Sequence, residues 1–529
     1  MPLFTSAERH FARAVGDLTH CNPFLPERIE RERAALGSEF VAEESDWNVH
    51  PDCPQVPINL ARILERCETL LDRARHKLSR GASGFGSELP LYEDLLLAVL
   101  YHRHRPAFDE LIGQSCDGRS PASAGKCYRE FVADAEGYIR FGDGLLPLHD
   151  QLPHLFAGFF QIRRAFANIF QWIIGVSGPA IRLRAAVWES IFTHDMRRYR
   201  RALFNHMADY TTLITGPSGT GKELVAQAIG RSRYIPFDTA KGKFGGAAGG
   251  SFFAVNLSAF SPTLIESELF GHKRGSFTGA VVDRRGWLEI CPPLGAVFLD
   301  EIGEVDQAVQ VKLLRVLQSR EFSRLGETEP RHFGGKIIAA TNRDLAAEMR
   351  SGRFRHDFYY RLCSDLIDVP GLRERIVDHP GELQHLVTHL AKRAVGAEGE
   401  SLAGEVVDWI ERQLGLDYPW PGNIRELEQC IRNVLIRRCY TPPADRVTEK
   451  SGRDQIVDAI GRGEMTADEL LRRYCTLVYS ATGSYEATAQ RLQIDRRTVR
   501  AKVDPGLLAE IGPMSTQGSA RRGRPPANP

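Results

Sequence analysis

The stretch Gly216-Pro217-Ser218-Gly219-Thr220-Gly221-Lys222 decides the fold class of this chain. It follows an apolar run, Thr212 to Thr215, and precedes a helical stretch from Glu223 to Gly230. Glycines let successive backbone N–H groups turn toward phosphates, the helix start adds its positive dipole end, and Lys222 reaches the β and γ oxygens. The stretch therefore predicts a nucleotide site. A chance glycine-rich turn is the alternative, and the flanking strand and helix argue against it.

The residues that would hold Mg²⁺ follow a second apolar run. Glu223 stands where a Ser or Thr hydroxyl usually meets the metal, so coordination must rely on a carboxylate or on water. Asp300 ends the run Ala296 to Leu299 and is predicted to hold Mg²⁺ through water, while Glu301 polarises the attacking water. Either acid alone would be interpreted as a solvated strand-end carboxylate. Together with the glycine-rich loop they indicate hydrolysis.

A third apolar run, Ile337 to Ala340, is followed by Thr341 and Asn342. The carboxyl ends of parallel strands meet at one sheet edge, so we expect Asn342 beside the γ-phosphate. Short apolar runs that alternate with helical stretches predict an α/β fold with a parallel sheet.

Composition bounds the class of protein. With 529 residues we expect three or four domains, and 43% hydrophobic and 26% charged residues exclude a mainly disordered chain. No apolar run reaches the roughly 18 residues of a membrane span, and the start lacks the apolar core of a secretory signal. Ten cysteines without a CxxC pair indicate reduced thiols. We therefore expect a cytoplasmic protein with no membrane contact.

Residues 1 to about 170 are predicted to be mainly helical. Apolar residues at helical spacing run from Leu60 to Leu78, and a second helix is expected from Leu91 to Tyr101. The stripe favours packing on the protein's own core, with a dimerising helix as the alternative. Aromatic residues crowd the stretch from Tyr128 to Trp172, which favours core over a ligand pocket. Cys116 and Cys127 with His102 and His104 are interpreted as structural, with a metal site as the alternative.

Between the two halves of the nucleotide site lies a second glycine-flanked stretch, Gly271 to Ala280. It predicts an exposed loop, and an exposed Phe277 indicates a binding partner. Here the sequence resembles the AAA+ activators of sigma-54 RNA polymerase, the bacterial enhancer-binding proteins. Their loop signature stands here as Gly275, Ser276, Phe277, Thr278, Gly279 and Ala280. The resemblance implies that this loop contacts sigma-54 and that ATP hydrolysis with Mg²⁺ converts closed promoter complexes into open ones.

The resemblance runs from Thr211 to about Arg437. It implies that Asn256 restrains the catalytic Glu301, that Arg355 and Arg361 reach a neighbouring subunit's γ-phosphate, and that Arg425 senses nucleotide from a helical lid. Without it, each arginine would more often be a surface ion pair. Fingers supplied by a neighbour imply a homo-oligomeric ring, in this family usually a hexamer.

The sequence also departs from the family pattern. Pro217 replaces a usual Glu, and Lys273 and Arg274 make the base of the loop more basic. The stretch from Tyr234 to Ser251 is long and is predicted to be a surface excursion. The basic segment from Met196 to Arg201 favours an added helix, with a nucleic-acid contact as the alternative.

The C-terminal end is basic although the whole chain carries only +1. Residues 471–529 hold ten Lys or Arg against four Asp or Glu, a net +6. The spacing from Ser484 to Lys502 resembles the helix-turn-helix of many enhancer-binding proteins, with Gln493 in place of the turn glycine. The expected contacts with double-stranded DNA are Arg496, Arg497, Thr498, Arg500 and Lys502. The tail around Arg521 resembles an AT-hook, and a plain basic tail is favoured over it.

These predictions divide the chain into an N-terminal regulatory domain at 1–172, an AAA+ core at 173–370, a lid at 371–440, a linker at 441–465, a helix-turn-helix module at 466–505 and a disordered basic tail at 506–529. The function predicted is ATP-driven, sigma-54-dependent transcription regulation. A nucleotide-binding, DNA-binding regulator that acts without sigma-54 is the first alternative, and a protein-remodelling AAA+ of another clade is the second. No receiver-domain layout is evident in the N-terminal domain.

Overall fold

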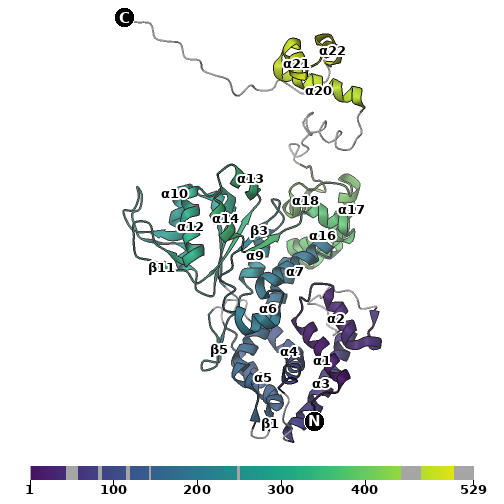
Figure 1. The fold of residues 1–529 in the computed structure, drawn as a ribbon, viewed down its shortest axis with the longest axis vertical. Coiled ribbons are helices and arrows are strands. Elements are labelled where there is room, and N and C mark those ends of the chain that lie inside the picture. The colour runs from purple at the N-terminus through teal and green to yellow at the C-terminus, as the bar shows by residue number, and fades with distance from the viewer. Residues whose placement is uncertain are drawn as a thin grey trace. The chain divides into compact units, whose positions relative to one another are not determined.

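The computed structural model describes residues 2–42, 57–80, 86–114, 120–141, 144–246, 251–442 and 466–504. They form two compact units, Met1–Cys439 and Tyr440–Pro529, which are described separately below (Figure 1).

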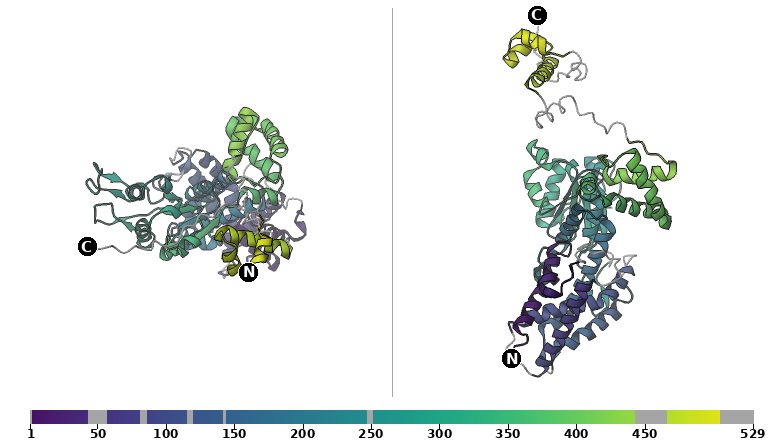
Figure 2. Two further views of the ribbon diagram at one scale, coloured as in Figure 1. Left: turned by 90° about the horizontal axis from the view of Figure 1, so that it is seen from above. Right: turned by 90° about the vertical axis from the view of Figure 1, so that its right-hand side faces the viewer.

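The N-terminal part of the first unit is helical, as predicted. Its helices α1, α3 and α4 pack side by side in the views of Figures 1 and 2. The elements are α1 (Ser6–His20), α2 (Glu27–Leu36), η1 (Gly37–Glu39), α3 (Ile58–Ser79), α4 (Leu89–Gly113), α5 (Ala124–Ile139), a hairpin of β1 (Arg140–Phe141) and β2 (Gly144–Leu145), η3 (Pro147–Gln151) and α6 (Leu152–Trp172).

The apolar stripe and the aromatic residues form the core that the sequence favoured. Ile63, Cys67 and Leu70 of α3 are buried, as are Phe131 and Phe156 from the aromatic stretch. Helix α4 continues past the expected end at Tyr101 and contains Pro106. The helix therefore tolerates a proline beyond its most deeply buried turns.

One long helix and two short helical turns lead from the N-terminal part to the sheet. They are α7 (Gly178–Phe192), α8 (Met196–Arg198) and a π-helical turn, η4 (Tyr199–Leu203). The basic segment is thus helical, as predicted. The Arg197 guanidinium donates to Asp94 of α4 at 2.8 Å and lies 3.6 Å from Asp17 of α1. Arg197 therefore pairs with acids of the N-terminal helices.

A five-stranded parallel sheet forms the centre of the nucleotide-binding part, with strand order β13-β3-β12-β9-β6. One face packs on α6, α7 and α9 through Ile214, Phe298 and Ile338, and the other packs on α10, α12 and α14 through Leu213 and Val297. The strands are β3 (Thr212–Thr215), β6 (Phe252–Asn256), β9 (Ala296–Asp300), β12 (Lys336–Thr341) and β13 (Asp365–Asp368). Every residue of β12 is buried because both faces are covered.

Helices surround this sheet and continue into a separate helical cluster after β13 (Figure 1). Around the sheet are α9 (Lys222–Gly230), η5 (Leu257–Ala259), α10 (Pro262–Phe270), α11 (Trp287–Ile290), η6 (Ile302–Glu304), α12 (Gln307–Ser319), α13 (Leu345–Arg350) and α14 (His356–Leu362). Two hairpins project from it, β7 (Gly271–His272) with β8 (Arg284–Arg285) and β10 (Glu321–Phe322) with β11 (Arg331–His332). The later cluster, predicted as the lid, contains α15 (Leu372–Asp378), α16 (Gly381–Val395), η7 (Gly396–Glu398), α17 (Gly399–Gln413) and α18 (Asn423–Arg437).

The stretch predicted as a surface excursion keeps an exposed hairpin turn but anchors three apolar side chains in the N-terminal part. Residues 234–246, here called the insert, form a hairpin of β4 (Phe237–Asp238) and β5 (Lys243–Phe244). Ile235, Phe237 and Phe244 belong to the same buried cluster as the N-terminal helices. The prediction was wrong in this respect because these apolar side chains find a partner surface far away in the sequence. Residues 247–250 lie outside the described part.

Within residues 466–504, the second unit contains three helices, α20 (Ala467–Thr482), α21 (Tyr485–Leu492) and α22 (Arg496–Lys502). The predictions made for 443–465 and for 505–529, including the Arg521 tail, lie outside the described residues. Across the ranges that are described, no helix has both the length and the apolar character that crossing a bilayer requires.

Candidate functional site

The phosphate-binding loop, residues 216–222, joins β3 to α9 and turns on three glycines. Gly216, Gly219 and Gly221 have φ values of 137°, 79° and 95°, which disfavour other residues. A Cβ at Gly216 would lie 2.6 Å from the carbonyl oxygen of Val369, and one at Gly219 would lie 2.3 Å from that of Gly422. Two of the glycines are therefore required by the close approach of neighbouring backbone as well as by the turn.

The loop presents donors that suit a chain of phosphates. Within the described residues, the backbone N–H groups of Gly219, Thr220, Gly221 and Lys222 donate no hydrogen bond to protein. The Lys222 ammonium donates to the carbonyl oxygens of Gly216 at 2.9 Å and Pro217 at 3.0 Å. Thr220 is tied by its hydroxyl to Pro217 at 3.0 Å. Unpaired N–H groups at a helix start beside a lysine fit a triphosphate.

Two carboxylates face this lysine from the end of β9. Burial lowers the pKa of Lys222, while the charges of Glu301 and Asp300 oppose that shift. Burial raises the pKa of Asp300, and the Glu301 N–H and Lys222 oppose that shift. Oxygen ligands such as these are what Mg²⁺ prefers, so the donor set fits the metal. Glu223, in the first turn of α9, adds a further carboxylate that raises the pKa of Asp300.

Glu301 is held by its neighbours in an unusual backbone conformation. Its φ is 56°, in the left-handed region, and its N–H donates to Asp300 Oδ1 at 3.1 Å. The N–H of Asn342 donates to Glu301 Oε2 at 3.4 Å, so β12 and β9 bring these residues together as expected. Strain of this kind is commonly found at functional sites.

Asn256 lies at the same sheet edge but its side chain has another partner. The parallel register places it opposite Asp300. Its side-chain oxygen accepts from the N–H of Ser258 at 3.0 Å and from its hydroxyl at 2.8 Å. The contact that holds Glu301 in this structure comes from Asn342, and restraint by Asn256 stays a prediction.

The lid reaches the phosphate-binding loop through the start of α18. The Arg425 N–H donates to the Gly219 carbonyl at 3.2 Å, and its guanidinium lies 3.5 Å from the Ser218 hydroxyl. Asn423, which sequence reasoning did not single out, donates to the Ser218 carbonyl at 2.9 Å and accepts from the Leu372 N–H at 2.9 Å. Asn423 has φ 50°, a conformation that Asn tolerates better than most residues.

A second contact that the sequence did not reveal holds the segment between α6 and α7. Glu382 of the lid accepts from the N–H groups of Val176 at 2.6 Å and Ser177 at 2.9 Å. Arg375 donates to Glu382 at 2.7 Å, and both side chains are buried. Residues 173–178 carry no charged motif, so only the tertiary structure shows that the lid binds them.

The interaction loop, residues 275–280, lies in the connection between β7 and β8 and forms a hydrogen-bonded turn. Gly275 N–H donates to the Ala280 carbonyl at 2.8 Å, and Ala280 N–H donates to that of Phe277 at 3.0 Å. Ser276 bonds back to the Lys273 carbonyl at 2.6 Å. Thr278 and Gly279 are exposed at the tip, while Ala280 is buried.

Phe277 is less exposed than the sequence predicted. Its ring is half-buried and meets His272 edge-on with centroids 5.0 Å apart. At the base of the loop, the Lys273 ammonium lies 3.2 Å from Asp283 and 3.6 Å from Glu327, while Arg274 is exposed. Thr278 is therefore exposed at the tip, and Phe277 is partly exposed beside it. The backbone hydrogen bonds within the loop hold both residues in place.

Comparison with known proteins agrees with this combination of loop and nucleotide site. Residues 192–367 match the family model described as the Sigma-54 interaction domain. This chain contains a sigma-54 interaction domain. The Nif-specific regulatory protein of Azotobacter vinelandii is 43% identical over 226 residues, which cover 43% of this chain and 40% of that protein.

Two longer alignments extend beyond the sigma-54 interaction domain. The DNA-binding transcriptional regulator NtrC of Azospirillum brasilense is 35% identical and covers 56% of this chain and 64% of its own length. The transcriptional regulatory protein ZraR of Klebsiella oxytoca is 36% identical and covers 57% and 66%. The chain thus spans about two fifths of the Nif-specific regulators it matches.

The sigma-54 interaction domain carries its two candidate arginine fingers on α14. Arg355 is the N-cap of this helix and pairs with Asp357 at 2.7 Å, and its N–H donates to Gln310 Oε1 at 2.9 Å. Arg361 is exposed in the last turn of the same helix. Arg355 thus precedes the first turn and Arg361 lies in the last turn of one short helix, and their contact with a neighbouring subunit stays a prediction.

The three helices of the second unit have the predicted helix-turn-helix pattern. Ser484 caps α21, Asp495 caps α22 by accepting from the Arg497 N–H at 2.7 Å, and Gln493 takes the turn with φ 55°. Arg497, Thr498 and Arg500 are exposed, whereas Arg496 lies 3.4 Å from Glu486 and Lys502 pairs with Asp468. Arg496 is exposed as well, so four of the five predicted DNA contacts are exposed and Lys502 is half-buried.

Helix α9 connects the sigma-54 interaction domain to the N-terminal part at its far end. The Ser232 carbonyl accepts from Gln161 at 2.9 Å, and the Ser232 hydroxyl accepts from Asn168 at 3.0 Å. The insert then follows, with Phe244 stacked on Phe160 at 4.2 Å between ring centroids. This connection had no sequence signal beyond the apolar residues of the insert.

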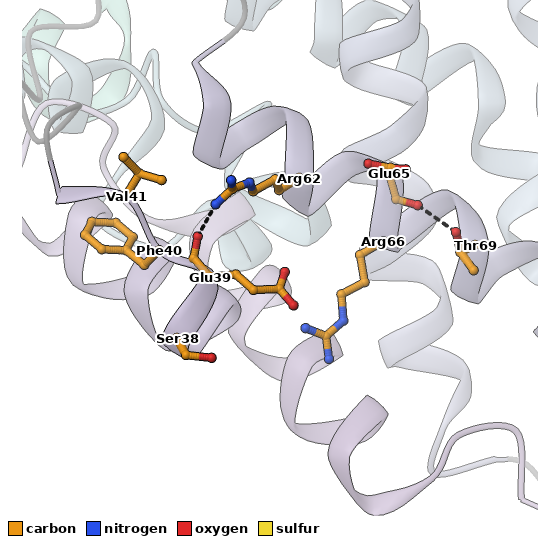
Figure 3. Close-up of a pocket in the computed structure, with 8 residues that line it drawn as sticks. All are labelled: Ser38, Glu39, Phe40, Val41, Arg62, Glu65, Arg66 and Thr69. Carbon is orange, nitrogen blue, oxygen red and sulfur yellow. Dashed lines mark hydrogen bonds between the residues drawn. The ribbon is translucent and has the colours of Figure 1, made fainter.

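Other candidate sites in the N-terminal part are separate from the nucleotide site. A hollow of about 750 Å³ lies beside α3, where Arg62 donates to the Glu39 carbonyl (Figure 3). His104 bonds Asp134 at 3.0 Å, and burial lowers the pKa of His102 to about 4. Cys116 lies outside the described residues, and inside them no group of three side chains suited to a metal occurs. The hydrogen bond of His104 to Asp134 and the burial of His102 agree with the structural interpretation of these two histidines.

Proposed function

We propose that this protein is a DNA-bound AAA+ ATPase that uses ATP and Mg²⁺ to remodel sigma-54 RNA polymerase from closed to open promoter complexes. The observation that carries the proposal is that one domain presents both the interaction loop with Thr278 at its tip and a phosphate-binding loop with unpaired N–H groups. The matched sigma-54 interaction domain supports the same partner.

The nucleotide chemistry follows from the residues around Lys222. The loop N–H groups and the Lys222 ammonium bind the phosphates, and Mg²⁺ supplies further neutralisation of their charge when Asp300 holds it. Glu301, positioned by Asn342, orients the attacking water and accepts its proton. Phosphoryl transfer depends mainly on positioning and charge, which is what these groups provide.

The lid and the neighbouring subunit complete the site. Arg425 and Asn423 bind the loop from the lid, so loss of the γ-phosphate changes what holds the lid in place. Arg355 and Arg361 act from an adjacent copy in a ring, which we propose is a hexamer. Movement of the β7–β8 hairpin then carries the interaction loop against sigma-54.

The C-terminal module holds the protein near its promoters. Helix α22 enters the major groove of double-stranded DNA, and Arg497, Thr498 and Arg500 contact bases and phosphates. Arg496 and Lys502 exchange their ion-pair partners for phosphates. The site of action is the cytoplasm, where the polymerase is.

Thr278→Ala tests the assignment of the loop. We expect the variant to hydrolyse ATP at the wild-type rate and to lose sigma-54-dependent open-complex formation in a purified transcription assay. Thr328→Ala, an exposed threonine on a nearby loop, is the matched control. Unchanged transcription by Thr278→Ala would refute the assignment.

A pull-down of sigma-54 with a transition-state nucleotide analogue separates the proposal from its alternatives. A regulator that acts without sigma-54 would bind DNA and ATP and leave sigma-54 in solution. An AAA+ remodeller of another clade would in addition fail to retain DNA through residues 440–529.

A further inference from the structure

The segment between α6 and α7, residues 173–178, is bound from two sides by buried arginines. Arg184 reaches it from α7, and Arg375 reaches it from helix α15 of the lid. Their acceptors are three successive carbonyl groups, those of Ile173, Ile174 and Gly175. The segment directly follows α6, so the lid is bonded to the point where the N-terminal helices end.

The N–H groups that follow these carbonyls donate to two carboxylates of the lid. Glu382 accepts from Val176 at 2.6 Å and from Ser177 at 2.9 Å. Asp378 accepts from Gly178 at 2.7 Å. Glu382 is completely buried, so its charge would be poorly compensated if the segment separated from the lid.

Gly175 shows how closely the lid approaches the segment. Its φ is 138°, and a Cβ there would lie 2.3 Å from both Arg375 Nη2 and Glu382 Oε1. Arg375 also donates to Glu382 at 2.7 Å, so the buried ion pair lies directly against the glycine. A side chain at this position would therefore push the pair apart or detach the segment.

Helix α15 connects this contact to the nucleotide site. It begins at Leu372, whose N–H donates to Asn423 at 2.9 Å, and Asn423 donates to the Ser218 carbonyl of the phosphate-binding loop at 2.9 Å. The same helix carries Arg375 near its middle and Asp378 at its end. One helix of seven residues is thus bonded toward the loop at its start and to the segment farther along.

We propose that residues 173–178 with Arg375, Asp378 and Glu382 form a regulatory clasp, by which the N-terminal part holds the lid against the phosphate-binding loop and thereby strengthens nucleotide binding. The proposal rests on the proposed binding of nucleotide at Lys222. Nucleotide binds the state in which the lid lies on the loop, so nucleotide and clasp favour the same state. Linkage then requires that nucleotide stabilise the clasp as much as the clasp strengthens nucleotide binding. A change in the N-terminal part that moves the end of α6 acts on nucleotide affinity through the clasp.

Amide hydrogen exchange of the full-length protein tests the clasp, because the N–H groups of residues 176–178 donate to the lid itself. Saturating ADP is expected to slow exchange of these three amides by at least about tenfold, since it populates the attached lid. Exchange in α21 of the second unit should be unchanged. ADP binding in calorimetry without slower exchange at 176–178 would overturn the clasp alone. Absence of ADP binding would overturn the proposed function and the clasp with it.

The double variant Arg375→Met/Glu382→Met tests the clasp from the other direction. Replacement of a buried ion pair by apolar residues often preserves stability, so the lid is expected to stay folded. ADP binding should weaken by at least about fivefold, and the slowing of exchange by ADP should be lost. Lys392→Met/Glu400→Met, an exposed ion pair of the lid at 2.9 Å, is the matched control and should bind ADP as wild type does. Unchanged ADP affinity in Arg375→Met/Glu382→Met would overturn the proposal.

Gly175→Ala is a second variant that leaves every charge in place. Its Cβ would meet Arg375 and Glu382, so we expect weaker ADP binding and faster exchange at 176–178. Gly396→Ala, also in the lid, is its control for backbone strain, because Gly396 has φ 75° and a Cβ there would have no atom within 4 Å. The control should bind ADP as wild type does. Wild-type ADP affinity in Gly175→Ala would contradict the clasp.

Discussion

The two ends of helix α9 differ in how they are built. At its start, Lys222 and the preceding glycines form the phosphate-binding loop within one contiguous stretch of chain. At its end, Ser232 and the insert are bound by α6 and by aromatic rings of the N-terminal core. The first end depends on local backbone geometry and the second on packing between distant segments.

The phosphate-binding loop and the N-terminal core therefore meet opposite ends of one short helix. Helix α6 packs on α9 and bonds to Ser232 just beyond its end, so we expect substitutions there to act mainly on packing. The comparison therefore predicts large catalytic effects with little loss of stability at the start of α9, and the reverse at its end.

Lys222→Ala should give the largest effect. Removal of the ammonium that binds the phosphates is expected to lower the ATP hydrolysis rate by more than about 1000-fold, or about 4 kcal/mol, with the melting temperature unchanged. A phosphate-release assay measures it. Lys241→Ala in the insert, an exposed lysine paired only with Asp238, should hydrolyse ATP normally.

Phe244→Ala tests the far end of α9. The ring is buried and stacks on Phe160, so its loss should lower the free energy of unfolding by about 3–5 kcal/mol. Denaturant unfolding of the full chain measures it, with the exposed aromatic Tyr360→Ala as control. A change below about 0.5 kcal/mol would mean that the insert lies on the surface after all.

The pH dependence of stability tests Lys336, a buried lysine in the sheet on which α9 packs. It is buried at the start of β12, donates to the carbonyls of Met207 and Tyr210, and burial lowers its pKa to about 8. The unfolded chain then binds more protons between pH 8 and about 10.5, so the free energy of unfolding should rise by about 3 kcal/mol across that window. Denaturant unfolding at each pH measures this rise in the free energy of unfolding. If Lys336→Met showed the same rise, Lys336 would not be its cause.

Asn423→Gly is expected to have the smallest effect of the four. Glycine keeps the positive φ, while the hydrogen bonds to Ser218 and Leu372 are lost. ATP binding should weaken by about tenfold, or about 1–2 kcal/mol, as measured by calorimetry. Asn433→Ala, at a half-buried position farther along the same helix, should bind ATP as wild type does. Unchanged affinity in Asn423→Gly would show that Arg425 alone connects the lid to the loop.

Much of the molecule was predictable from short stretches of sequence. The strands ending at Thr215, Asp300 and Thr341, the parallel sheet they form, the helical N-terminal part and the pair of helices around Gln493 were confirmed. Each depends on local patterning, on turn residues or on strand ends that meet at one sheet edge. The match to the sigma-54 interaction domain confirmed the resemblance drawn from the loop residues.

The remaining features depend on which distant segments meet. Nothing near Phe237 or Phe244 in the sequence indicates that α5 and α6 will cover them, and the half-burial of Phe277 depends on His272 across the hairpin. The hydrogen bonds from the Val176 and Ser177 N–H groups to Glu382 join residues about 200 positions apart in the chain. Chemistry that resides in a motif can be identified from the order of residues, because backbone geometry over a few residues creates it. Coupling between parts is a matter of packing, and packing is decided only when the whole chain has folded.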